Sequence, residues 1–283
     1  MKAKAMIVTA LLLGAAMGAK AQVDVTKVDA THYTFVMPAY DVEVTTELYY
    51  KLYAQVSLTS NKTAYFTKTN FFLDRTLTKD VWNTFASPFA ITEDKMETYF
   101  GAGVKVRQLG STTIEEGNIL SLNFVTASSI EAGKPYIVKP TAANVDFSAD
   151  GKEFAGVDLS AATATPDETT YVDFVPTLGL TNVTGNVDDI LIMTIEGKLV
   201  HPTETGTMKG FRGYFVLHDA PAGARGFSIN FGDGETTGIM PIRMENGTAT
   251  TSGMTFDLQG RRIEGQPTVK GVYIQNGKKV IIK

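Results

Sequence analysis

The chain has no cysteine among its 283 residues. Without a thiol it can form no disulfide scaffold, cysteine nucleophile, Cys-ligated zinc site or iron–sulfur cluster. Histidine is scarce as well, and His32, His201 and His218 stand far apart, outside any HExxH spacing. We find no GxSxG, SxxK or phosphate-binding GxxxxGK(S/T) motif either. The sequence therefore predicts no cofactor, no metal and no catalytic motif, although a triad built from distant residues stays open.

Long apolar runs are absent after residue 21, so no membrane-spanning helix is expected. Within residues 1–21, Lys2 and Lys4 precede a short apolar stretch, and the small residues Ala19 and Ala21 come shortly before Gln22. That order is typical of a secretory signal peptide, whose apolar part is shorter than the roughly 20 residues of a bilayer span. Glutamine at position 22 gives no sign of lipoprotein processing. Residues 1–21 are thus predicted to be a cleaved signal peptide, with a buried N-terminal helix as the alternative.

Positive charge is also limited in the body of the chain. Loss of the three leader lysines takes the formal charge from −4 to −7. From Asp257 onward, six basic residues face two acidic ones, a balance of +4, which leaves residues 22–256 at −11. Nucleic-acid binding needs clustered Lys and Arg, so the sequence excludes nucleic acid as the expected partner.

Short stretches of period-two alternation follow one another from Val23 onward, separated by Gly, Asn, Asp and Pro. This pattern predicts an all-β fold whose main domain is an antiparallel β-sandwich. The predicted strands are 33–36, 42–45, 52–59, 63–69, 71–73, 82–85, 104–109, 119–125, 136–139, 171–175, 189–194, 213–217 and 226–231.

One short helix is predicted over 93–100. Thr92 is its expected N-cap, acidic residues occupy the first turn and Gly101 follows as a stop. Met96, Tyr99 and Phe100 share one side at helical spacing, which favours core packing over a binding stripe.

Composition divides the mature chain into three parts. Residues 22–47 form a short β segment, and residues 48–235 carry the predicted sandwich. The stretch 232–253 is rich in Gly and Thr and reads as a linker. It leads into a small alternating C-terminal module, so we place the last boundary at 236–283.

The C-terminal module resembles the sorting domains of Bacteroidetes proteins exported by the type IX secretion system. The resemblance covers about the last 45 residues: a DLxGR motif, a spacer, KGxYI and a turn before a Lys-rich strand. It rests on Asp257, Gly260, Arg261, Arg262, Gly271, Tyr273, Gly277, Lys278 and Lys279. It implies a small Ig-like β module that engages the secretion machinery and is commonly cleaved. An ordinary terminal β-hairpin domain is the alternative.

Two further resemblances point to the same kind of protein. Residues 33–44 resemble the closing strands of divergent internalin-type B repeats in Bacteroidetes surface proteins. The region 48–235 resembles β-rich secreted proteins of Bacteroidales, in three phrases: Trp82-Asn83-Thr84-Phe85 with Ser87-Pro88-Phe89, residues 131–139 (EAGKPYIVK) and residues 208–215 (MKGFRGYF). This resemblance implies that the protein is secreted or at the cell surface, and it implies no particular reaction.

Aromatic residues crowd the start of the main domain: Tyr49, Tyr50, Tyr53, Tyr65, Phe66, Phe71, Phe72 and Trp82. Exposed rings can stack on sugars or anchor a protein partner, whereas buried rings fill a sandwich core. Neighbours in a strand face opposite sides, so one ring of each adjacent pair points away from the core unless another layer covers it. We select Tyr49, Tyr50, Phe72 and Trp82 as candidate binding residues.

Acidic residues allow two other hypotheses. Asp188-Asp189 and Asp233-Gly234-Glu235 offer oxygen ligands for calcium, but neither forms an EF-hand, and turn chemistry explains them without metal. Paired carboxylates for glycoside hydrolysis need a defined gap that sequence does not show. Arg212, in the last phrase, is expected to pair with a carboxylate inside the fold.

The sequence as a whole favours a secreted protein with a binding, adhesion or structural role. We expect the protein to pass through the periplasm to the cell surface or the extracellular space. Its expected partners are the secretion machinery and a glycan, host protein or surface protein. The alternative is a secreted hydrolase that acts on carbohydrate through a carboxylate site built from loops.

Overall fold

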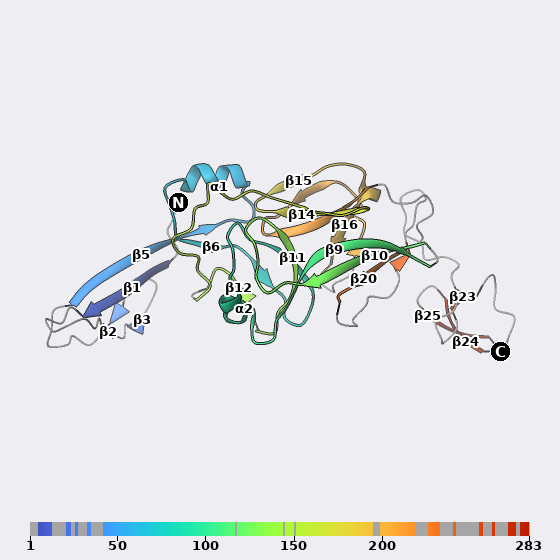
Figure 1. The fold of residues 1–283 in the computed structure, drawn as a ribbon, viewed down its shortest axis with the longest axis horizontal. Helices are drawn as coiled ribbons and strands as arrows, with labels where there is room; N and C mark the ends of the chain where they lie inside the picture. Colours follow the sequence, from blue (N-terminus) through green and yellow to red (C-terminus); the bar gives the residue numbers. More distant parts are fainter. Residues whose placement is uncertain are drawn as a thin grey trace.

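The computed structural model describes residues 48–232 apart from 117, 144, 150, 195–198 and 219–225. Beyond that range it describes the strand segments 5–12, 21–23, 26–27, 33–34, 42–47, 240–241, 255–256, 262–263, 271–275 and 278–282. The described chain is mostly β-strand, with several sheets and few helices (Figure 1). The predicted all-β, sandwich-like fold is confirmed.

Two sheets form the sandwich. The six-stranded sheet has the order β21 (Met240–Pro241), β20 (Gly226–Asn230), β10 (Ile119–Thr126), β9 (Lys105–Glu115), β11 (Pro135–Lys139) and β8 (Asn83–Ala86). The five-stranded sheet has the order β13 (Asp167–Glu168), β14 (Val172–Thr177), β19 (Arg212–Leu217), β16 (Ile190–Met193) and β17 (Leu199–Val200). In Figure 1, β14 and β16 lie above β9, β10 and β20.

Side chains from the facing sides of these two sheets make one apolar cluster, which we call the inter-sheet core. Phe174 of β14 stacks on Phe215 of β19 with ring centroids 4.3 Å apart, and Phe124 of β10 meets both rings edge-on. Alternation along β19 places Phe215 and Leu217 inward, as its burial pattern shows. The core comprises Trp82, Leu109, Leu120, Leu122, Phe124, Ile137, Val172, Phe174, Leu191, Leu199, Phe215, Leu217, Phe227, Ile229 and Phe231.

A second apolar cluster, the outer core, lies against the opposite face of β8, β9 and β11. Tyr136 and Val138 of β11 belong to it, whereas Ile137 belongs to the inter-sheet core, so β11 is buried on both faces. The other side of this cluster comes from α2, β6 and the pair β7 (Thr76–Leu77) and β12 (Val145–Asp146). Phe85, Phe100 and Phe147 pack together there through close ring contacts. The described fold therefore has a third layer at one end of the sandwich.

A four-stranded sheet carries the N-terminal part. Its order is β2 (Ala21–Val23), β1 (Ala5–Leu12), β5 (Val42–Leu52) and β6 (Phe71–Leu73). Three smaller elements are the strand pair β3 (Thr26–Lys27) and β4 (Tyr33–Thr34), the strand pair β15 (Thr181–Val183) and β18 (Gly206–Met208), and the 3-10 turn Val187–Asp189. Strand β5 crosses the domain boundary that the sequence places at residue 48.

The predicted helix is confirmed as α2 (Glu93–Phe100), with Met96, Tyr99 and Phe100 buried in the outer core. Thr92 is the N-cap residue, but its side chain makes no capping hydrogen bond; its carbonyl accepts from Lys95 N at 3.0 Å. Gly101 ends the helix with a φ of 99°, a conformation that suits glycine. Among the described residues, no helix is long and apolar enough to cross a membrane.

The predictions of strands at 52–59 and 63–69 are wrong, because α1 (Leu58–Tyr65) occupies that stretch. Ser57 starts this helix: its Oγ accepts from Ser60 N at 3.2 Å and its carbonyl accepts from Asn61 N at 3.0 Å. The helix also has a topological cause. Strands β5 and β6 are parallel neighbours, and a parallel pair needs a crossover rather than a tight turn.

The expected antiparallel pairing holds in most of the described ladders but not in all of them. Besides β5 and β6, strands β10 and β20 run parallel, from Ile119 opposite Gly226 to Asn123 opposite Asn230. Strand β20 follows β10 only after the whole five-stranded sheet, so the chain has ample length to return in the same direction. Eight other predicted strands agree closely: β6, β8, β10, β11, β14, β16, β19 and β20 begin and end within about two residues of their prediction. Strand β9 continues to Glu115 and strand β5 to Leu52, well beyond the predicted ends at residues 109 and 45.

Candidate functional site

Three of the four candidate aromatic residues lie in the interior. Tyr49 is 3% exposed, Phe72 1% and Trp82 6%. The Tyr49 and Phe72 ring centroids are 5.3 Å apart, and Trp82 stacks on Phe231 at 4.6 Å. These rings therefore do not present a face to solvent, and the packing interpretation describes them. Phe71 and Phe72 are both fully buried because further layers cover both faces of β6.

Tyr50, the fourth candidate, is half-buried at the surface beside α1. Its ring lies 5.6 Å from that of Tyr65, and the Lys68 ammonium lies 5.0 Å from its ring centroid. The next residue after Tyr65 is Phe66, at the C-cap of α1, and its side chain is 76% exposed. We call Tyr50, Phe66 and Lys68 the aromatic surface; Tyr65, whose ring contacts that of Tyr50 and which precedes Phe66 in the chain, is itself buried. This surface combines an exposed apolar ring with a cation over a second ring.

Exposure of this size is unusual among the large apolar side chains of the described chain. Only Leu48 and Val125 join Phe66 among those that the described part exposes, and each is less than half exposed. A single exposed apolar residue needs no functional explanation. Phe66 is notable because it follows Tyr65, whose ring contacts that of Tyr50. Sequence reasoning did not select it, because a strand over 63–69 leaves its direction open, whereas the end of a helix turns it outward.

A second group of polar side chains surrounds Asp167 at the start of β13. Lys134 Nζ lies 4.0 Å from Asp167 Oδ1 and 3.7 Å from Glu131 Oε2. Among the described residues, the Oδ2 atom of Asp167 is buried without a hydrogen-bond partner. Burial raises the pKa of Asp167 to about 6, against the opposing effect of the Lys134 charge, and Glu131 raises it further. A carboxyl group whose pKa is raised toward neutrality beside a second carboxylate has the character of a general acid.

Replacing Asp167 by asparagine should stabilise the protein at pH 7.5 and change little at pH 4. The folded-state pKa lies above the unfolded one, so the native state binds the proton more tightly and stability falls as pH rises from about 4 to 6. Above that window the full penalty applies; after allowance for partial solvation we expect a gain of about 1 kcal/mol. Urea unfolding of both proteins at both pH values measures it. A variant less stable than the parent at pH 7.5 would contradict the burial account.

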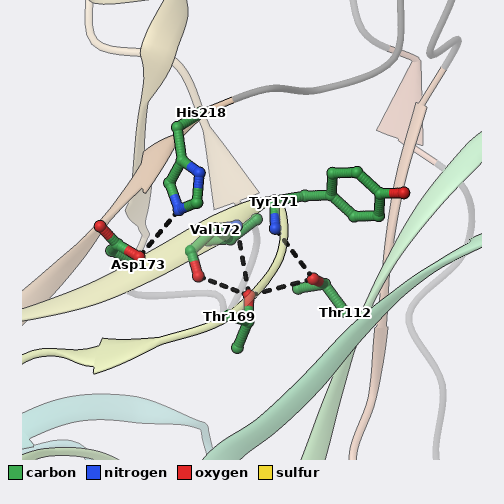
Figure 2. Close-up of polar contacts among 6 residues, drawn as sticks. All are labelled: Thr112, Thr169, Tyr171, Val172, Asp173 and His218. Atoms are coloured by element: carbon green, nitrogen blue, oxygen red, sulfur yellow. Dashed lines mark hydrogen bonds and ion pairs between the residues drawn. The ribbon is translucent and has the colours of Figure 1, made fainter.

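His218 and Asp173 form a polar pair on the outer side of the five-stranded sheet (Figure 2). His218 follows the end of β19, and its Nε2 lies 2.8 Å from Asp173 Oδ1 on β14. Nearby, the Thr169 hydroxyl donates to Val172 O at 2.6 Å and lies 3.0 Å from the Thr112 hydroxyl (Figure 2). These two hydroxyls fasten the turn at Thr169–Val172 onto β9, a structural use that does not require an activated nucleophile.

The other residues considered for metal or acid–base chemistry are dispersed. His201 follows β17, and its Nδ1 atom lies 2.9 Å from the backbone carbonyl of Ile190 at the start of β16. The ring therefore contacts the backbone of the neighbouring strand. Asp188 and Asp189 are exposed in the 3-10 turn, whereas His32 and residues 233–235 lie outside the described residues. No group of three or more His, Cys, Asp or Glu side chains comes together as a metal site within the described chain.

The C-terminal strands form a four-stranded sheet of their own, in the order β23 (Arg262–Ile263), β22 (Thr255–Phe256), β24 (Gly271–Gln275) and β25 (Lys278–Ile282). Gln275 pairs with Lys278, so a two-residue connection joins β24 to β25, as an Asn-Gly hairpin requires. Arg262, Gly271, Tyr273, Lys278 and Lys279 lie on these strands. Asp257, Gly260, Arg261 and Gly277 lie outside the described residues. The sorting role stays a prediction.

The predicted leader takes part in the N-terminal sheet of the full chain. Strand β1 pairs antiparallel with β5, from Ala5 opposite Tyr49 to Leu12 opposite Val42. Ala21 and Gln22 lie on β2, and Ala19 lies outside the described residues. Cleavage after Ala21 stays a prediction; it would remove β1 and leave β5 with β6 as its remaining neighbour.

The phrase at 208–215 is explained by close packing between loops. An added Cβ at Gly210 would lie 2.7 Å from Gly179 Cα, and Gly210 N donates to Ala54 O at 2.8 Å. Phe211 adopts a φ of 63° and is fully buried in the outer core. Gly213 leaves room for the Phe174 ring, which an added Cβ would approach to 2.6 Å. Gly210, Phe211 and Gly213 of this phrase therefore have packing roles, whereas Lys209 is exposed.

Comparison with known proteins adds no relative. Searches against family models, curated proteins and solved structures each found no match to this chain.

Proposed function

We propose that the mature chain is a secreted cell-surface protein with a binding, adhesion or structural role, and that the aromatic surface contacts its ligand. The observation that carries this proposal is the 76% exposure of Phe66, which follows Tyr65 in the chain, together with the partly exposed Tyr50, whose ring contacts that of Tyr65. An exposed ring carries a cost in water that contact with a sugar face or an apolar anchor site removes. The N-terminal signal would export the protein, and the C-terminal module would sort it to the surface.

The charge of Lys68 supports the same use of this surface. Its ammonium covers one face of the Tyr50 ring at 5.0 Å, which leaves Phe66 as the free apolar face. Such a combination suits a sugar ring or a protein loop that brings both an apolar face and an acceptor. The rest of the described body is acidic and presents few other large apolar side chains, so contact at this surface would be selective.

We expect the mature protein to be retained on a glycan array or on an array of host and bacterial surface proteins. Retention of a Tyr50→Ala/Phe66→Ala double variant should fall at least tenfold, since loss of two aromatic contacts costs about 1.4 kcal/mol or more. Val125→Ala is the matched control, because Val125 is an exposed apolar residue on β10, outside the aromatic surface. Equal retention of the double variant and the parent would contradict this assignment.

The alternative function is a secreted hydrolase that acts on carbohydrate. Asp167 favours it, because a carboxyl with a pKa of about 6 is suited to donate a proton, and Glu131 offers a second carboxylate. Incubation of the purified protein with polysaccharides, followed by a reducing-sugar assay, separates the two functions. Sugar release that disappears in Asp167→Asn would establish the hydrolase, whereas retention of an intact glycan supports binding.

A further inference from the structure

Three cationic side chains lie around Asp74: Lys51 pairs with it, Arg75 follows it in the chain, and Arg212 is close enough to be affected by its charge. Lys51 lies near the end of β5, Arg75 follows β6 after one residue, and Arg212 begins β19. Asp74, between β6 and Arg75, is held by its backbone N–H, which donates to Leu52 O at 2.9 Å. Burial lowers the pKa of Arg75 to about 9, and the Arg212 charge lowers it further, so the two guanidinium groups lie near enough for their charges to oppose each other.

This cluster lacks negative charge. Asp74 forms an ion pair with Lys51, whose side chain is almost fully buried. Its charge also favours the charged form of Arg212, but it is one carboxylate for three cations. The guanidinium groups themselves bond to backbone carbonyls: Arg75 Nη2 donates to Thr84 O at 2.7 Å and Arg212 Nη1 donates to Gly210 O at 2.9 Å. Grouped cations at the edge of a protein interior require compensation, because burial penalises each charge.

One donor in the cluster has no acceptor. Arg75 Nε is buried, and it has no hydrogen-bond partner in the part of the chain that the structure describes. Buried N–H groups without a partner are rare in folded proteins, because each one loses its hydrogen bond to water. Arg75 and Arg212 are half-buried as whole residues, as is Asp74, so the cluster also reaches solvent.

We propose that Arg75 and Arg212 form a binding site for a small oxyanion, a carboxylate or a tetrahedral phosphate or sulfate group. The planar guanidinium fork matches the oxygens of such groups, and two adjacent forks offer donors on two sides of one anion. Bound oxygen atoms would accept from Arg75 Nε and offset the charge that Asp74 leaves uncompensated. This site is separate from the aromatic surface and stands whether or not that surface binds a glycan.

The acidic body sharpens this proposal. Residues 22–256 carry a formal charge of −11, so the long-range field repels anions and only local contacts favour them. Binding should accordingly be weak, in the millimolar range for a free inorganic ion, and should depend on these two arginines alone. A surface lysine elsewhere should contribute nothing.

Thermal unfolding and ¹H–¹⁵N spectroscopy with sodium phosphate test this site at constant ionic strength. Phosphate should raise the melting temperature of the purified chain saturably and shift the Arg75 Nε–H resonance. In Arg212→Met the apparent affinity should fall at least tenfold, whereas Lys209→Met, which removes the same charge from an exposed neighbour, should respond like the parent. Arg75→Gln provides a second variant if Arg212→Met does not fold.

Sodium acetate and sodium sulfate, titrated in the same way, separate the two chemistries. Saturation by acetate alone assigns a carboxylate ligand, and saturation by sulfate and phosphate alone assigns a tetrahedral one. Equal responses of the parent, Arg212→Met and Lys209→Met would reduce the effect to a general salt effect and overturn the proposal. An unchanged Arg75 Nε–H resonance at saturating concentrations of all three anions would overturn it as well.

Discussion

Replacement of Gly133 by alanine is expected to prevent stable folding. Gly133 has a φ of 82°, and an added Cβ would lie 1.9 Å from Thr163 O, well inside contact distance. The backbone cannot easily retreat, because Gly133 N donates to Ser87 O at 2.7 Å and Thr165 N donates to Gly133 O at 3.0 Å. We expect a loss of about 3 kcal/mol or more, from backbone strain and steric clash together. Urea unfolding monitored by circular dichroism measures this loss.

Gly103→Ala provides the matched control for this change. Gly103 has a φ of 71°, similar to that of Gly133, but an added Cβ would meet nothing within 4 Å. Its replacement should therefore cost only the left-handed backbone strain, about 1 kcal/mol. Similar losses in the two variants would show that the contact between residues 133 and 163 is absent from the folded protein.

Replacement of Phe215 by alanine should remove about 3–5 kcal/mol of stability, which is a large fraction of the stability of a typical domain. Phe215 is fully buried at the centre of the inter-sheet core and stacks on Phe174 at 4.3 Å. Its loss leaves a cavity between two sheets whose backbones are fixed by ladder hydrogen bonds on both sides of β19, so little collapse is expected. The midpoint of urea unfolding, with the slope held common, gives the value.

The control for Phe215 is Phe66→Ala, which removes the same side chain from an exposed position. Because Phe66 is 76% exposed, we expect a stability change within about 0.5 kcal/mol. That result would also qualify Phe66→Ala for the binding experiment, since any loss of retention would then reflect contact with the ligand. A large loss in Phe66→Ala together with a small one in Phe215→Ala would contradict the arrangement of the two sheets.

Local signals in the sequence predict the sandwich strands and α2 well. Helix α2 is bounded by Thr92 and Gly101, and its apolar residues recur at helical spacing, so its position depends on nearby residues alone. Strand β19 of the inter-sheet core alternates cleanly, since its inward and outward residues differ in burial, whereas β11 is buried on both faces. Elements such as α2 and β19 need no knowledge of the rest of the fold.

Helix α1 shows where this reasoning fails. Its residues, LTSNKTAY, have little apolar periodicity and include several Thr and Ser, which favour strands and turns as much as helices. The helix is stabilised by the Ser57 cap and by its place in the crossover between the parallel strands β5 and β6. That strand pairing belongs to the tertiary structure, and local sequence does not show it. The outward direction of the Phe66 side chain depends on this helix. The aromatic surface therefore could not be predicted from the sequence either.

The buried aromatic residues show a related limit. Phe71 and Phe72 alternate across β6, and sequence alone could not show that layers cover both faces of this strand. Arg75 and Arg212 are 137 positions apart in the sequence, so no local motif predicts their cluster. The expectation for Arg212 was partly met: Asp74 acts on it electrostatically, but Asp74 makes its ion pair with Lys51.

The proposed function requires export of the protein to the cell surface. The most direct test of this export is to measure the location and the first residue of the protein in a type IX-competent host. Mass spectrometry of surface-released peptides should find the chain outside the cell and beginning at Gln22. A chain that lacks residues 236–283 should begin at the same residue and stay in the periplasm. Protein that begins at Met1 inside the cell, or a truncated chain that reaches the surface equally well, would contradict the account.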